Sequence, residues 1–159
     1  MKKKILLILF FLLILILSFI FYQNKKEQPL ERIYLSEKYY KEESGEFIKV
    51  EKKELEKNKE ETYILYTYNS FCSFPISCES IFKEFMETHH IDFVSIPFAE
   101  FKKTLFYPKV KYAPSIIIIQ NQKIIAYLDA ESNEDIERYQ DVEKLKQWLE
   151  KYIYLSIEE

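Results

Sequence analysis

Cys72 and Cys78 are the two cysteines of this 159-residue sequence, and they lie six positions apart. The residues between them separate an apolar, strand-like run from an amphipathic helical pattern. Neighbouring thiols at the start of a helix are typical of thiol–disulfide exchange, because the helix dipole favours the thiolate, which is the nucleophilic form. The same two sulfurs could instead form a structural disulfide. The residue types and their placement leave both interpretations open.

The spacing sets a condition on any disulfide between these cysteines. Six positions along a continuous helix span about 9 Å, whereas the Cα atoms of a disulfide lie within about 7 Å of each other. The segment must therefore be partly non-helical, and Pro75 favours this because it disfavours helical backbone at the residue before it. We expect the helix to begin near Ser77, with the serine hydroxyl as its N-cap, and Cys72–Ile76 to fold back as a loop.

His89 and His90 would complete a set of four metal-ligating side chains with the cysteines. Zinc fingers space their cysteines by about two to four residues and their histidines by about three to five. Adjacent histidines also point to different sides of a helix. We therefore expect no zinc site, no other metal and no cofactor, and we keep copper carriage by two cysteines and one histidine as an alternative.

The composition excludes several classes of function. Gly45 is the single glycine, so the chain contains no glycine-rich dinucleotide loop, no P-loop and no G-x-S-x-G nucleophile elbow. All 26 acidic residues and 20 of the 23 basic residues lie beyond Tyr22, which gives that part of the chain a formal charge of −6. Nucleic-acid binding requires a positive surface, so we expect no nucleic-acid partner.

The N-terminus has the pattern of a membrane anchor. Three lysines, Lys2 to Lys4, precede an uncharged apolar run from Ile5 to Tyr22, which would span about 27 Å as a helix. No small-residue cleavage site follows the run, which indicates an uncleaved signal-anchor. The lysines favour a cytoplasmic N-terminus and an extracytoplasmic C-terminal part. In that location disulfides form and persist.

Three segments follow from these patterns: residues 1–22 as the transmembrane signal-anchor, 23–46 as a polar stem, and 47–159 as one domain. Fully extended, the stem would reach roughly 80 Å from the bilayer. In the domain we expect strands at 47–50, 63–68, 91–96, 115–119 and 123–128, and helices at 51–61, from about 77 to 89, at 99–106 and at 142–153. A two-residue turn, Asn121-Gln122, should join the last two strands. This order predicts an α/β three-layer sandwich.

Two motifs give this pattern a likeness to a known family. A buried strand runs into the aromatic–cysteine pair Phe71-Cys72, and about 40 residues later Tyr112-Ala113-Pro114-Ser115 opens another buried strand. Over residues 46–155 the chain thus resembles the thioredoxin fold, with the second motif at the position of that family's cis-proline. With its anchor and stem, the chain is similar to membrane-anchored thioredoxin-like proteins of Gram-positive bacteria, including bacteriocin transport accessory proteins.

The resemblance implies a role for each matching residue. Cys72 would attack the disulfide of a substrate, Cys78 would resolve the mixed disulfide, and Ala113 and Pro114 would dock the substrate backbone. The chain departs from the family pattern at three positions, and the first is Phe71, where a tryptophan is usual before the first cysteine. Pro75 stands where the second cysteine is usual, and Tyr66 stands where a buried acid that shuttles protons would lie.

The leading hypothesis is a membrane-tethered, extracytoplasmic thioredoxin-like thiol–disulfide oxidoreductase that uses the C-x5-C pair. Its partners would be cysteine-containing secreted or membrane proteins, or a membrane redox partner, and residues 5–22 would lie in the lipid bilayer. The alternative is a non-catalytic accessory or binding module, in which a Cys72–Cys78 disulfide only stabilises the fold.

Overall fold

The computed structural model describes residues 31–69 and 77–157. The chain divides into two compact units, Met1–Glu31 and Arg32–Glu159, and almost all described residues belong to the second unit. Within the described ranges, none of the helices combines the length and the apolar character that a membrane span needs. The predicted signal-anchor, residues 5–22, and Cys72 both lie outside the described residues, so these two predictions stay untested.

The described residues alternate strands and helices in the predicted order. The strands are β1 (Phe47–Lys49), β2 (Thr62–Tyr68), β3 (Phe93–Pro97), β4 (Ser115–Gln120) and β5 (Lys123–Tyr127). The α-helices are α2 (Lys52–Lys57), α3 (Cys78–His89), α4 (Phe98–Phe101) and α5 (Val142–Leu149). Two short 3₁₀ helices, η1 (Glu37–Tyr39) and η2 (Ile136–Tyr139), lie before β1 and before α5.

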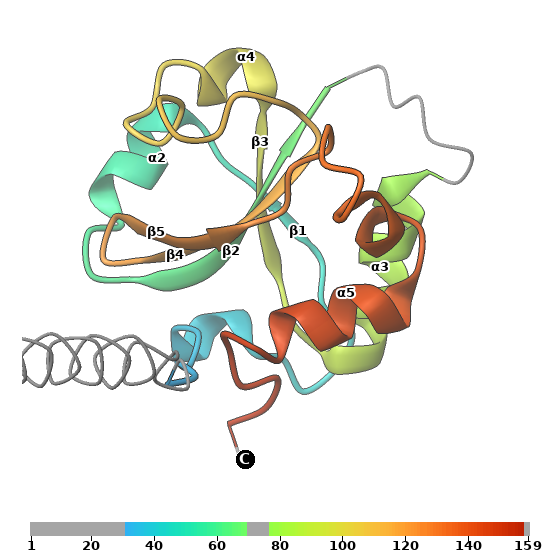
Figure 1. The fold of residues 1–159 in the computed structure, drawn as a ribbon. Coiled ribbons are helices and arrows are strands. Elements are labelled where there is room, and N and C mark those ends of the chain that lie inside the picture. The colour runs from blue at the N-terminus through green and yellow to red at the C-terminus, as the bar shows by residue number, and fades with distance from the viewer. Residues whose placement is uncertain (1–30, 70–76, 158–159) are drawn as a thin grey trace, which may run out of the picture. The chain divides into compact units, whose positions relative to one another are not determined.

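The strands form one mixed sheet in the order β1-β3-β2-β4-β5. Strands β1, β3 and β2 are parallel, whereas β4 runs antiparallel to β2 and β5 antiparallel to β4. Helices α3 and α5 cover one face of the sheet, and α2 and α4 lie on the other (Figure 1). This strand order, with these directions and helices on both faces, is that of a thioredoxin-like α/β sandwich, so the predicted fold is confirmed.

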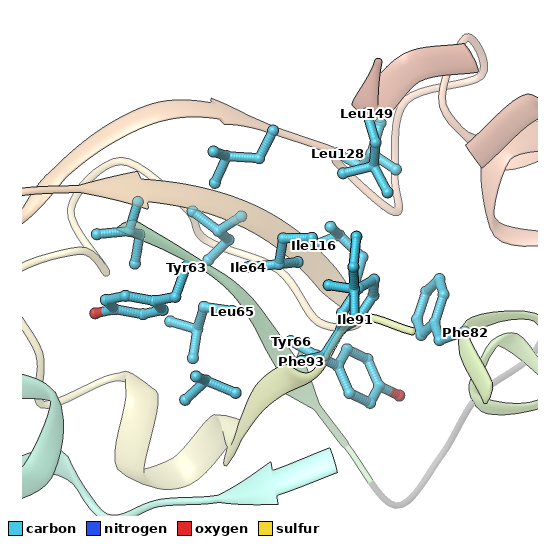
Figure 2. Close-up of a cluster of buried hydrophobic side chains, with 14 of the residues drawn as sticks. Tyr63, Ile64, Leu65, Tyr66, Phe82, Ile91, Phe93, Ile116, Leu128 and Leu149 are labelled. Carbon is cyan, nitrogen blue, oxygen red and sulfur yellow. The ribbon is translucent and has the colours of Figure 1, made fainter. Parts of the chain in front are cut away.

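The centre of the sheet is buried on both faces. Residues Tyr63 to Leu65 of β2 and Ile116 to Ile119 of β4 are fully buried, as expected for strands covered by helices on either side. Figure 2 shows side chains of β2 packed with those of β3 and β4. On the α3 side, the ring of Tyr66 meets the ring of Phe82 edge-on, with centroids 5.0 Å apart. This contact fixes α3 against the sheet.

The turn between β4 and β5 has the predicted form. Asn121 and Gln122 both adopt left-handed backbone, with φ values of 49° and 61°. The side-chain amide of Gln122 also donates to the backbone carbonyl of Leu55 at 3.0 Å, near the C-terminal end of α2. This contact occupies a carbonyl that a longer helix would have used. It accounts for the end of α2 at Lys57, four residues before the end that the charge pattern predicts.

Helix α4 is also shorter than the predicted helix at 99–106. The Thr104 hydroxyl donates to the carbonyl of Phe101 at 2.8 Å and accepts from the amide of Phe106 at 3.3 Å. A side chain that satisfies backbone groups in this way competes with the helical hydrogen bonds. The helix therefore gives way to a turn after Phe101.

Residues 32–46, which the sequence pattern assigns to the stem, lie against the domain. Leu35 and Tyr39 belong to the buried core. The backbone of Ile33 pairs with the end of the chain, since its amide donates to Tyr152 at 2.8 Å and its carbonyl accepts from Tyr154 at 3.0 Å. This part of the predicted stem is therefore packed structure, because apolar residues within the polar composition reach the core.

Gly45 makes a close backbone approach that explains its position. Its amide donates to the carbonyl of Met86 at 3.1 Å, at the end of α3. A Cβ atom at this position would lie 2.2 Å from the carbonyl oxygen of Ile91, which is far inside van der Waals contact. Only glycine allows the segment to lie this close to the chain entering β3.

We expect Gly45→Ala to lower the free energy of unfolding by about 2–3 kcal/mol, because the added methyl group overlaps backbone atoms that must move. Urea unfolding of the full-length chain, followed by circular dichroism, measures this change. Ser44→Ala, at the exposed neighbouring position, is the control and should stay within about 0.5 kcal/mol of the parent. Equal stability of the two variants would contradict the close approach.

Candidate functional site

Cys78 is the first residue of α3 and is buried, with 1% of its surface exposed. The residue before it, Ser77, has extended backbone and forms the N-cap, as predicted. Its hydroxyl makes no capping hydrogen bond, contrary to the prediction. Instead, the Ser80 hydroxyl donates to the carbonyl of Ser77 at 2.6 Å. The start of the helix is thus fixed one residue before the cysteine.

Cys78 lies on the buried face of α3. Phe82 is four residues further along the helix and therefore lies on the same face as Cys78. Phe82 is fully buried and packs against Tyr66 of β2 and against Tyr139, with ring centroids 5.0 and 5.9 Å apart. The Cys78 side chain is therefore directed into the domain. Cys72 lies outside the described residues, so its pairing with Cys78 stays a prediction.

The loop before β4 contains a cis peptide bond between Ala113 and Pro114, as the resemblance implies. Pro114 is buried, Ala113 is half-buried, and the preceding Tyr112 is 43% exposed. The Ser115 hydroxyl donates to the carbonyl of Tyr112 at 2.8 Å and closes the loop. The structure thus forms the predicted loop, while the role of Ala113 and Pro114 in docking a substrate stays a prediction.

The sheet brings this loop to the end of the strand that leads to the cysteines. In the antiparallel pair of β2 and β4, Thr67 lies opposite Ser115. The last residues of β2 therefore lie beside the first residues of β4. The segment that carries the cysteines follows β2, and the cis-proline loop precedes β4. The C-terminal end of β2 and the cis-proline loop therefore lie at the same end of the sheet.

Tyr139, in η2, is a buried residue of this site that the sequence pattern does not identify. Its hydroxyl lies 2.7 Å from the carbonyl oxygen of Leu128 and 3.1 Å from that of Pro114, and it donates its one proton to this pair of acceptors. Burial raises the pKa of Tyr139 well above its ordinary value, although hydrogen bonds with the backbone of Ile116 and the side chain of Ser115 act in the opposite direction. The negative charge of Asp135 adds to the effect of burial. The hydroxyl therefore remains a donor.

The segment that carries Tyr139 connects β5 to α5 and is held by its own polar contacts. The Asp135 carboxylate accepts from the backbone amide of Asp129 at 2.9 Å and forms an ion pair with Arg138. Asp141 caps α5 by accepting from the amide of Lys144 at 3.0 Å. These contacts on both sides of η2 fix the backbone from which Tyr139 projects.

Tyr66 occupies the position at which the family carries a buried acid. The residue is 6% exposed, and its ring lies among the rings of Phe47, Tyr68 and Phe82, with centroids 5.0 to 5.7 Å away. This aromatic cluster extends the core to the start of α3. The side chain that the resemblance places at the position of a buried acid therefore lies, in this structure, within an aromatic cluster.

A metal site finds no support in the described ranges, where no group of three or more histidine, cysteine or acidic side chains is placed to hold an ion. Cys78 and His89 are the first and last residues of α3. Eleven positions along a helix separate two residues by about 16 Å. Cys78 and His89 therefore cannot bind one metal ion together, which removes this histidine from the copper alternative.

Comparisons with known proteins give likenesses to solved structures of thioredoxins. No protein-family model and no curated protein matches the sequence. The thioredoxin preprotein of Schistosoma mansoni is 19% identical, with 69% of this chain and 100% of that chain covered and a TM-score of 0.46. The oxidised thioredoxin of Plasmodium falciparum is 16% identical, with 70% and 100% covered and a TM-score of 0.48. A putative oxidoreductase with a thioredoxin fold is 13% identical, with 64% and 91% covered and a TM-score of 0.48.

Three buried tyrosines differ in the hydrogen-bond partners of their hydroxyls. Replacing each of them with phenylalanine therefore gives a series in which the same group is removed from different surroundings. The Tyr139 hydroxyl has the two carbonyl partners named above, and the Tyr39 hydroxyl donates to the Glu61 carboxylate at 2.7 Å. The Tyr63 hydroxyl is buried, and among the described residues it has no hydrogen-bond partner. We expect Tyr139→Phe and Tyr39→Phe each to lower the free energy of unfolding by about 1–2 kcal/mol.

Tyr63→Phe should be neutral or stabilising, because it removes a buried polar group that lacks a partner. Urea unfolding of the three full-length variants measures the series. If Tyr139→Phe behaves like Tyr63→Phe, the hydrogen bonding of the Tyr139 hydroxyl does not stabilise the fold.

Proposed function

We propose that this chain is a membrane-tethered, extracytoplasmic thiol–disulfide oxidoreductase in which Cys72 and Cys78 form the redox pair. The observation that carries the proposal is the position of Cys78. It is the first residue of α3 and lies on the helix face that meets Tyr139, whose hydroxyl reaches the carbonyl of Pro114. A thiol and a cis-proline loop therefore share a neighbour in the fold.

The burial of Cys78 supports a division of roles. A sulfur with 1% of its residue exposed is out of reach of a disulfide in another folded protein, so Cys78 suits the resolving step. Cys72 is then the attacking thiolate. It forms a bond to one sulfur of the client disulfide, and the other client sulfur leaves and takes up a proton.

In the second step, Cys78 loses its proton to solvent and attacks the Cys72 sulfur of the mixed disulfide, which expels the second client thiol. The client gains two electrons and two protons, and the chain ends with a Cys72–Cys78 disulfide. Turnover then requires a membrane or secreted dithiol to return the two electrons. The reverse sequence would oxidise a client dithiol and pass its electrons to a disulfide-containing partner.

The membrane location in this proposal is supported by the sequence. The uncharged run at 5–22 follows three lysines, and outside the cytoplasm the disulfides of client proteins can form and persist. The order of anchor, polar segment and thioredoxin-like domain supports a likeness to bacteriocin transport accessory proteins. A cysteine-containing secreted or membrane protein is the client class that this order favours.

Single cysteine variants of the full-length, membrane-inserted chain test the proposal. We expect Cys78→Ser to accumulate mixed disulfides with client proteins, because the attacking thiol remains and the resolving thiol is lost. Cys72→Ser should form none, since the attacking thiol is absent. Non-reducing gels after acid quenching measure both outcomes. Full cellular function of both single variants would falsify the redox role.

The aromatic environment of Tyr66 favours a second candidate function. The proton-transferring acid of the family is absent from that position, and the rings around Tyr66 offer packing instead of proton transfer. In this alternative the chain is a non-catalytic accessory or binding module. A Cys72–Cys78 disulfide would then close a short loop and contribute about 2–3 kcal/mol to stability.

The reduction potential of the cysteine pair separates the two functions. Exchange chemistry predicts a value above about −300 mV, whereas a structural disulfide predicts a value well below that limit. Equilibration of the full-length chain in detergent with dithiothreitol buffers, followed by thiol trapping, gives the value. A potential far below the limit would rule out the oxidoreductase and support the accessory module.

A further inference from the structure

We propose that Tyr139 is a positioning residue that couples the Ala113–Pro114 loop to Cys78, so that capture of a client peptide at the loop depends on the Tyr139 hydroxyl. The inference rests on the proposed function, because it assigns a partner residue to the same site. It concerns a residue in the irregular connection between β5 and α5, away from both motifs that carry the family likeness.

The hydroxyl side of Tyr139 contacts the loop. Its oxygen lies within hydrogen-bond distance of the carbonyls of Pro114 and Leu128, so it bridges the start of β4 and the residue after β5. On the other side of Ala113, the Ser115 hydroxyl holds the carbonyl of Tyr112. Side-chain hydroxyls therefore hold the carbonyls on both sides of Ala113, and the loop is presented in one conformation.

The ring side of Tyr139 contacts the helix that carries the thiol. Its centroid lies 5.9 Å from that of Phe82, in an edge-on arrangement, and Phe82 shares a helix face with Cys78. A single buried side chain thus connects the two parts of the site.

The connection is stiff because Tyr139 has no room to move. It is fully buried, and the Asp135–Arg138 ion pair and the Asp141 cap hold the backbone around it. A displacement of Pro114 must therefore break the hydrogen bond or shift a ring that packs on α3. Removing only the hydroxyl should loosen the loop while the ring packing stays.

Tyr139→Phe makes this change in the full-length chain. With a peptide disulfide as substrate, we expect the KM to rise about three- to tenfold, the range for one lost buried hydrogen bond, while kcat changes less than about twofold. Tyr39→Phe is the matched control, because it removes a hydrogen-bonded buried hydroxyl near Glu61, outside the site. It should leave KM and kcat at parent values. A 4-aminophenylalanine at position 139 restores a donor and should return KM towards the parent.

A second measurement does not require turnover. In a Cys72→Ser background, Cys78 is the single thiol, and its alkylation by iodoacetamide reports access to the site. We expect Tyr139→Phe to accelerate alkylation at least about threefold relative to Tyr39→Phe under native conditions, because loss of the connection between the loop and α3 should favour local opening around the buried thiol. Because both variants lose one buried, hydrogen-bonded hydroxyl, comparing them corrects the alkylation rate for a general loss of stability.

The two measurements separate this inference from the proposed function. If the parent turns over substrate and Tyr139→Phe leaves KM unchanged, the positioning role is overturned and the oxidoreductase stands. If the parent shows no turnover, the proposed function fails, and the alkylation rates decide the coupling alone. Equal alkylation rates for Tyr139→Phe and Tyr39→Phe would then overturn the positioning role of Tyr139. A faster rate for Tyr139→Phe would support that role.

Discussion

The antiparallel pairing of β2 with β4 is the constraint on which the site depends. Both strands are buried on both faces, and they pair in one continuous register that begins with Thr62 opposite Gln120. That register places Thr67 opposite Ser115 and thereby brings the end of β2 beside the cis-proline loop. A shift of one residue would turn the isoleucines of β4 to the opposite faces and separate the loop from the start of α3. The core and the site therefore have the same physical origin.

The site is completed by a segment that belongs to neither strand. Between β5 and α5, acidic side chains bind backbone amides and Arg138, and this polar framework carries one fully buried tyrosine. Burying a hydroxyl is costly unless it finds acceptors, and Tyr139 finds two carbonyls at strand ends. The same side chain thus packs on Phe82 and hydrogen-bonds to Pro114. Tyr139 therefore contributes both to the stability of the domain and to the geometry of the loop.

Much of this arrangement could be predicted from local patterns. The apolar runs identify β2 and β4, and Asn121 and Gln122 identify the hairpin turn. The cis bond before Pro114 was implied by the resemblance to the thioredoxin fold. Helix ends were less predictable, because Gln122 and Thr104 end helices through side-chain hydrogen bonds that have no periodic signal. Tyr139 could not be identified for a related reason. Its role depends on contacts with residues 11 and 25 positions away, and no local pattern encodes them.

In the membrane-anchored chain that we propose, the packing of residues 32–46 against the domain would shorten the tether. Residues 23–31 would then link the predicted anchor to the domain, and nine extended residues reach about 30 Å, well short of the roughly 80 Å expected for the whole stem. Ser36 binds Thr62 at the start of β2, whereas the cysteine segment follows the end of that strand about 20 Å further on. In the anchored chain that we propose, a client held in the same membrane would meet the thiols at a raised effective concentration, which a freely diffusing client would not. A short tether would therefore favour clients that share the membrane.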